Sequence, residues 1–292
     1  MKRNKVFKIA SALLLLCVLT TCVIGTTFAK YTSADGGFDN ARVAKWGVIV
    51  AADGSLFGKN YDDAIVADGD ANIAVSGAAD VVAPGTKNES GFMIKIEGEP
   101  EVDFVLAAST VAANNKDIVL KKNKYAVMVE VTDVLNHAAD ITAYYTEAAG
   151  KYTPATTYTP GTKYYRALDE VDVTADYYPV VWEVTNDGAD TVAITKTKIT
   201  EIADALVTAI NGMAKQTNEA VAINYLLKWK WEFGTDLTTE KNGADTILGH
   251  LQAGGVTVVK WDTTESKYVP LVAEDYNLEI GFNIEVGASQ VD

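Results

Sequence analysis

Cysteine and histidine are the residues that this sequence has least of. Its 292 residues include two cysteines and two histidines. Both cysteines, Cys17 and Cys22, lie near the N-terminus, so the rest of the chain has no disulfide framework, thiolate metal site or cysteine nucleophile. His137 and His250 are far apart and form no H-E-x-x-H zinc motif, and no nucleophile elbow or phosphate-binding glycine loop occurs. These absences predict a protein that is not an enzyme and needs no cofactor.

Acidic residues are missing from the N-terminal segment, which is typical of a secretory signal peptide. Residues 9–29 carry no charge and follow a basic start made of Lys2, Arg3, Lys5 and Lys8. Small residues precede a predicted cleavage site between Ala29 and Lys30. Two alternatives stay open, an uncleaved membrane anchor and lipidation at Cys22. The favoured interpretation is cleavage, which predicts a protein secreted to the extracellular matrix or cell surface that meets the membrane only through residues 1–29.

Basic residues are also in deficit over the whole chain. Lys and Arg number 25 against 39 Asp and Glu, which gives a net charge of −14. Loss of the four basic residues of the signal peptide would take the charge to −18. Because such a surface repels polyanions, nucleic acid and anionic lipid are not expected partners.

Short apolar runs separated by Gly, Asn, Asp and Pro fill most of the remaining chain, a pattern typical of a sandwich or a barrel. Residues 91–96 show the clearest alternation, and residues 41–50 form the first such run. Helical spacing of apolar residues occurs in two places, 198–215 and 244–252. The sequence therefore predicts an all-β fold with one or two short covering helices, a polar and flexible segment at 30–40, and a domain over 41–292.

A stretch rich in Tyr, Thr and Pro interrupts this pattern at 144–165. It contains turn signals at Gly150 and at Pro160-Gly161, and it predicts a solvent-exposed β-hairpin or small subdomain inserted at 143–166. Exposed tyrosines could contact carbohydrate or another subunit. The favoured alternative is that they pack against one another across strands.

Oxygen-bearing side chains are densest around residues 62–72. Asp68, Asp70 and Asn72 match the first three ligand positions of a calcium loop, although Ile73 replaces the turn glycine and Ala79 stands where the bidentate Glu belongs. A solvated acidic loop is the favoured interpretation, and weak calcium binding is the alternative.

Three groups of motifs together resemble the TasA/camelysin (CalY-like) family of exported biofilm-matrix proteins. They are FAKYT at 28–32 with ARVAKW at 41–46, then APGT at 83–86 with GFMIKIEG at 91–98 and EPEV at 99–102, and finally WKWEF at 229–233, ADTILG at 244–249, IGFNIEV at 280–286 and QVD at 290–292. The resemblance covers most of the chain except the insert at 144–165. It implies a jelly-roll-like antiparallel β-sandwich, signal removal by a dedicated peptidase, and assembly into extracellular fibres.

The resemblance implies that in such fibres the freed N-terminal segment of one subunit adds as a strand to a sheet of the next subunit. The partner would be a second copy of the chain, together with other matrix proteins or polysaccharide, and the expected interface residues are Tyr31, Val43, Trp46 and Val48. For residues 41–50, pairing within their own subunit is the equal alternative. Two other functions stay open: a monomeric surface adhesin that binds glycans through the Tyr-rich insert, and a camelysin-like metallopeptidase, which the two isolated histidines do not favour.

Overall fold

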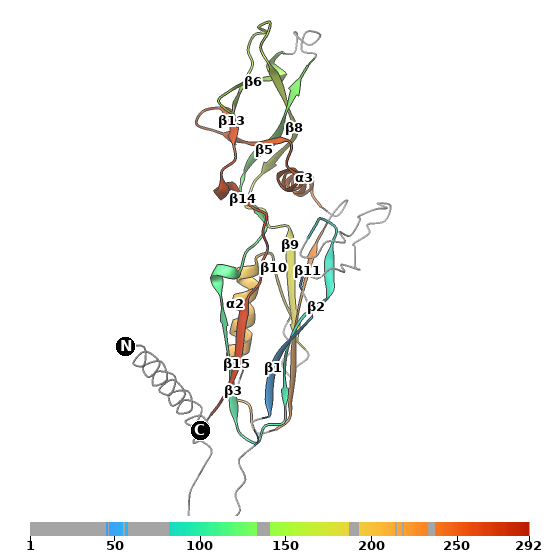
Figure 1. Ribbon diagram of the computed structural model, residues 1–292, viewed down its shortest axis with the longest axis vertical. Coiled ribbons are helices and arrows are strands. Elements are labelled where there is room, and N and C mark those ends of the chain that lie inside the picture. The colour runs from blue at the N-terminus through green and yellow to red at the C-terminus, as the bar shows by residue number, and fades with distance from the viewer. Residues whose placement is uncertain are drawn as a thin grey trace, which may run out of the picture.

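The computed structural model describes residues 45, 47–54, 56–57, 82–132, 141–186, 193–213, 215–217, 219–232 and 237–291. Figure 1 shows two β parts along the long axis, a sandwich-like part below and a barrel above, with helix α3 (Thr239–Ala253) between them. The strands of both parts pair antiparallel, which confirms the predicted all-β class with two covering helices. No helix in the described residues is long and apolar enough to cross a membrane.

The first layer of the sandwich is a five-stranded sheet in the order β1-β2-β11-β9-β10. Its strands are β1 (Val48–Gly54), β2 (Lys87–Gly98), β11 (Val221–Trp231), β9 (Val180–Asn186) and β10 (Ala193–Lys196). In β11 every second side chain from Ile223 to Trp231 is buried, because alternate residues of a strand point to opposite faces. One face of this sheet therefore forms the core of the sandwich.

The second layer combines two strands with a helix. Strands β3 (Phe104–Thr110) and β15 (Ile284–Gln290) pair only with each other among the described strands, and helix α2 (Ile199–Asn211) packs against β3, β9 and β10. Apolar residues of α2 at three- and four-residue spacings are fully buried: Ile199, Ile202, Leu206 and Ile210. Helix α2 therefore closes one side of the sandwich.

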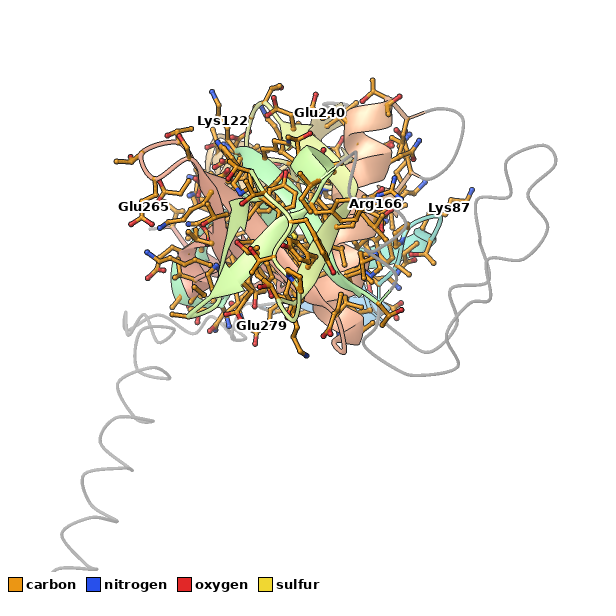
Figure 2. All side chains as sticks on the ribbon, turned by 90° about the horizontal axis from the view of Figure 1, so that it is seen from above. Lys87, Lys122, Arg166, Glu240, Glu265 and Glu279 are labelled. Atoms are coloured by element: carbon orange, nitrogen blue, oxygen red, sulfur yellow. The ribbon has the colours of Figure 1, made fainter. Side chains whose placement is uncertain are left out.

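The upper part is a closed six-stranded barrel in the order β12-β13-β7-β6-β8-β5. Its strands are β5 (Asn123–Val131), β6 (Tyr145–Ala148), β7 (Lys151–Pro154), β8 (Tyr164–Val173), β12 (Thr257–Asp262) and β13 (Lys267–Pro270). Figure 2, seen from the barrel end, shows charged side chains such as Lys122, Glu240 and Glu265 projecting outward.

The predicted Tyr-rich hairpin exists as β6 and β7, but it is part of the barrel wall and not a free projection. Strand β6 pairs with β8, and β7 pairs with β13. Closing the barrel buries Tyr152, which is 6% exposed and packs against Tyr165. Tyr164, only 1% exposed, lies in a separate cluster and stacks on Tyr158. The expectation of a solvent-exposed tyrosine surface was wrong for these residues, whereas the alternative of tyrosines packed against one another is confirmed.

The barrel and the sandwich meet at a waist that the chain crosses four times. The waist holds the short pair β4 (Val119–Leu120) and β14 (Tyr276–Asn277), together with the 3-10 turns η1 (Ala112–Asn114) and η3 (Ala273–Asp275). Buried Tyr125 and Val127 of the barrel belong to the same hydrophobic cluster as Ile247 of α3 and Trp182 of the sandwich. The two parts therefore share one core.

Candidate functional site: two open strand edges

The strands β1 and β15 lie side by side at the open side of the sandwich, at the edges of two different sheets. Among the described strands, β1 pairs only with β2, and β15 pairs only with β3. The two edge strands come close to each other without forming a ladder. An unpaired strand edge presents backbone N–H and C=O groups that another strand can bind. This side of the sandwich is therefore the part of the described structure best suited to accept a strand.

The space between these edges is a shallow apolar groove of about 220 Å³. Side chains of three strands line it: Val50 and Ala52 from β1, Phe92 and Ile94 from β2, and Ile284 and Val286 from β15. At its upper end Phe92 meets Phe282 edge to face, with ring centroids 6.3 Å apart. Apolar side chains of an added strand would find matching surface here.

The other edge of the β3–β15 pair is covered. The Asn211 side chain at the end of α2 imitates a neighbouring strand at Ala108 of β3: its Nδ2 donates to the Ala108 carbonyl at 2.9 Å, and its Oδ1 accepts the Ala108 N–H at 2.6 Å. Further along, the backbone of Gln216 exchanges two hydrogen bonds with Phe104, at 2.9 and 3.1 Å. Only the β15 edge of this pair stays open among the described residues.

The chain enters β1 at the end of the sandwich farthest from the barrel. The Lys45 backbone N–H donates to the Glu101 carboxylate at 2.8 Å, and the Glu101 N–H donates to the Lys45 carbonyl at 3.0 Å. Glu101 lies in the turn between β2 and β3, and Figure 1 places the lower ends of these strands opposite the barrel. Lys45, the first described residue, therefore lies at the free end of the sandwich.

Of the predicted interface and cleavage residues, the structure describes Val48. This residue lies opposite Gly98 in the β1–β2 ladder and packs against the core of its own subunit. The alternative of pairing within the subunit therefore holds for Val48. The other predicted residues lie outside the described ones: Ala29, Lys30, Tyr31, Val43 and Trp46.

Comparisons with protein-family models, curated proteins and solved structures gave no match. The resemblance to the TasA/camelysin family thus stays a prediction that rests on the motifs quoted above. The β15 side of the groove was not predicted from the sequence, because no local pattern shows which strands of a sandwich will stand at an edge.

Metal-binding residues do not gather in the described part of the chain, where no three His, Cys, Asp or Glu side chains are placed to share an ion. The predicted calcium ligands Asp68, Asp70 and Asn72 lie outside the described residues, as does His137. His250 on α3 contacts a carboxylate of the barrel, with Nε2 3.1 Å from Asp169 Oδ2. This pair explains His250 as a link between helix and barrel.

Proposed function

We propose that the protein is a secreted structural subunit that assembles into extracellular surface or biofilm-matrix fibres by donating its N-terminal segment to the next copy. The observation that carries this proposal is the pair of open edges on β1 and β15 with an apolar groove between them. In the barrel, every strand has a neighbour on both sides. The sandwich thus supplies the acceptor that strand addition requires.

The position of Lys45 supports a link between subunits. Lys45 lies at the free end of the sandwich, so a segment attached to it could reach a second molecule. Backbone hydrogen bonds to an open edge would supply affinity, and apolar side chains lying in the groove would supply register. The predicted signal cleavage before Lys30 would free this segment only after export.

Deletion of residues 30–44 tests the proposal directly. The chain that starts at Lys30 should form filaments visible by electron microscopy, and the chain that starts at Lys45 should stay a monomer with unchanged circular dichroism. The deletion leaves every described strand complete. Filaments of normal yield from the shortened chain would show that strand donation by this segment is wrong.

A matched pair of lysine substitutions on β1 tests the groove itself. Ala52→Lys places a charge among the residues that line the groove, whereas Ile49→Lys places the same charge on an exposed side chain outside that lining. We expect Ala52→Lys to slow filament growth at least tenfold, measured by light scattering, and Ile49→Lys to grow nearly as the parent does. Equal rates for the two variants would contradict a role for the groove.

A further inference from the structure

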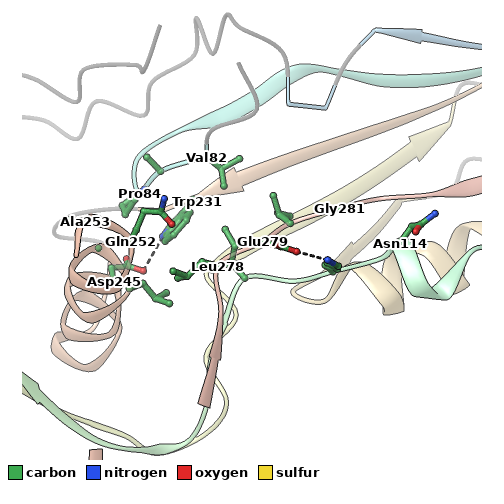
Figure 3. Close-up of a pocket in the computed structure, with 16 residues that line it drawn as sticks. Val82, Pro84, Asn114, Trp231, Asp245, Gln252, Ala253, Leu278, Glu279 and Gly281 are labelled. Carbon is green, nitrogen blue, oxygen red and sulfur yellow. Dashed lines mark hydrogen bonds and ion pairs between the residues drawn. The ribbon is translucent and has the colours of Figure 1, made fainter. Parts of the chain in front are cut away.

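A second cavity, larger than the groove, lies at the waist. Its lining residues near Phe282 precede Phe282 in the sequence, whereas those of the groove follow it. It has a volume of about 760 Å³ and opens between α3, the segment that precedes β2 and the segment that leads into β15. Figure 3 shows residues of these segments converging on it. This size falls within the range of small-molecule sites.

The walls of this cavity are mostly apolar. Val82 and Pro84 form one side, Leu248 of α3 another, and Leu278 and Ile280 a third. Aliphatic side chains from three segments that are distant in sequence would surround an apolar body of a ligand. Shape and lining therefore favour a ligand with a hydrocarbon part.

One carboxylate interrupts the apolar lining. Asp245 of α3 is 5% exposed, and its Oδ1 accepts hydrogen bonds from the Tyr177 hydroxyl at 2.9 Å and from Trp231 Nε1 at 3.0 Å. Its Oδ2 is buried and has no hydrogen-bond partner among the described atoms. A buried carboxylate oxygen without a donor is unfavourable, so a donor placed there by a ligand would be stabilising.

The charges around the cavity favour a positive ligand. Besides Asp245, the charged lining residues in the described part of the chain are Lys116 and Glu279, which form an ion pair with each other at the rim. Lys116 is therefore already neutralised, and Asp245 supplies the remaining negative charge. The net charge of −14 for the whole chain acts in the same direction.

We infer that the waist cavity binds a small cationic amphiphile, an alkylammonium compound whose ammonium group donates to Asp245 while its aliphatic part lies against Val82, Leu248 and Ile280. This inference is independent of fibre assembly, because the cavity shares no lining residue with the groove between β1 and β15.

The protonation state of Asp245 gives this site a pH dependence. Burial raises the pKa of Asp245 to about 7, while the hydrogen bonds from Tyr177 and Trp231 and the charge of Lys241 act to lower it. The charged groups that face the site from its other walls are Lys116 and Glu279. Because an ammonium ion binds the ionised carboxylate best, affinity should rise as the pH increases from about 5.5 to 8.

The experiment measures calorimetric binding of hexylammonium, hexanol and hexanoate to the chain without residues 1–29. Hexylammonium should bind at least tenfold more tightly than either analogue at pH 8, and this preference should shrink at pH 5.5. Equal binding of the three probes, no binding of any, or a preference independent of pH would each overturn the inference. The pH series needs no variant, so it decides the matter even if a substitution disturbs folding.

Two variants locate the site. Asp245→Asn keeps an oxygen for Tyr177 and Trp231 but removes the charge, so it should abolish the preference for hexylammonium over hexanol. Gly249→Leu should block all binding, since Gly249 lines the cavity and a Cβ there meets no atom within 4 Å. Thr246→Leu, an exposed position on the same helix outside the lining, is the control and should bind as the parent does. Binding that survives Gly249→Leu would place the ligand elsewhere.

Discussion

The barrel and the sandwich are built from similar antiparallel strands, yet the two parts differ in whether their outermost strands are paired on both sides. The barrel closes on itself and fills its interior with aromatic rings: Tyr152 and Tyr165 lie 5.0 Å apart, and Tyr268 lies 4.9 Å from Trp261, between ring centroids. The sandwich is closed by α2 on one side, and on the other side the outer edges of β1 and β15 pair with no strand among the described residues. Closure, more than composition, decides which part can accept another strand.

The largest loss of stability is expected when a large side chain is removed from the barrel interior. Tyr268 is fully buried, and Tyr268→Ala should lower the free energy of unfolding by about 3–5 kcal/mol. Because barrel and sandwich share one core through α3, urea unfolding followed by circular dichroism and by tryptophan fluorescence should give coincident transitions. Two separated transitions would show that the barrel unfolds alone.

The conservative substitution Tyr268→Phe separates packing from hydrogen bonding. The Tyr268 hydroxyl donates to Glu170 at 2.5 Å, and burial with this carboxylate raises the pKa of Tyr268 well above its usual value, so the hydroxyl stays protonated. Loss of the hydroxyl should cost about 1 kcal/mol, because Glu170 keeps its ion pair with Lys124. A loss as large as that of Tyr268→Ala would mean that the hydrogen bond, and not the ring, stabilises the barrel.

The next largest effect on stability is expected at the waist that joins the two parts. The pKa of Asp245 is raised from 3.8 to about 7 by burial, so the folded state holds a proton that the unfolded state releases. Stability should therefore be highest below about pH 4, fall as the pH rises to about 7, and change no further through this group. Asp245→Asn should remove this decline.

The measurement compares urea unfolding of the parent and of Asp245→Asn from pH 4 to 8. As the pH rises over this range, the free energy of unfolding of Asp245→Asn should increase relative to that of the parent by on the order of a few kcal/mol. The comparison cancels the titration of other carboxylates, which both proteins share. A difference that stays constant with pH would contradict the raised pKa.

A smaller effect than at the waist is expected at the covered edge of β3. Asn211→Ala removes two hydrogen bonds to Ala108 and should cost about 1–2 kcal/mol by thermal unfolding. Because it uncovers backbone groups on a second edge, it should also raise the tendency of folded protein to associate, measured by analytical ultracentrifugation. Asn242→Ala, a half-buried asparagine within α3, serves as the control.

Local patterns predicted much of this fold. The helical spacing at 198–215 corresponds to α2 at Ile199–Asn211, which Gly212 ends, and the alternation at 91–96 falls within β2. The helix predicted at 244–252 begins earlier, at Thr239, where the Thr238 hydroxyl accepts the Lys241 N–H at the helix N-terminus. The run predicted at 41–50 extends further, to Gly54, because β2 pairs with β1 along its whole length.

Features that depend on distant parts of the chain could not be predicted in this way. Strand β8 was missed because its charged residues 166–172 obscure the alternation, and it gains its buried face only when the barrel closes. Asp245 looked like an ordinary polar residue of a helix, since Tyr177 and Trp231, which bury it, come from other elements. The groove likewise needs β1, β2 and β15 together.

The pairing of β3 with β15 also governs how the chain can begin to fold. Thr110 of β3 pairs with Ile284 of β15, and in the five-stranded sheet Gly98 of β2 pairs with Val221 of β11. Both layers of the sandwich can therefore form only after strands that are synthesised much later. The barrel likewise needs β12 and β13 to close around strands from the middle of the chain. Such non-local partners slow folding, so a chain emerging from the ribosome would stay without a complete core until these strands are made. For a protein that we expect to be threaded across a membrane, this delay keeps the chain in a form that can be exported.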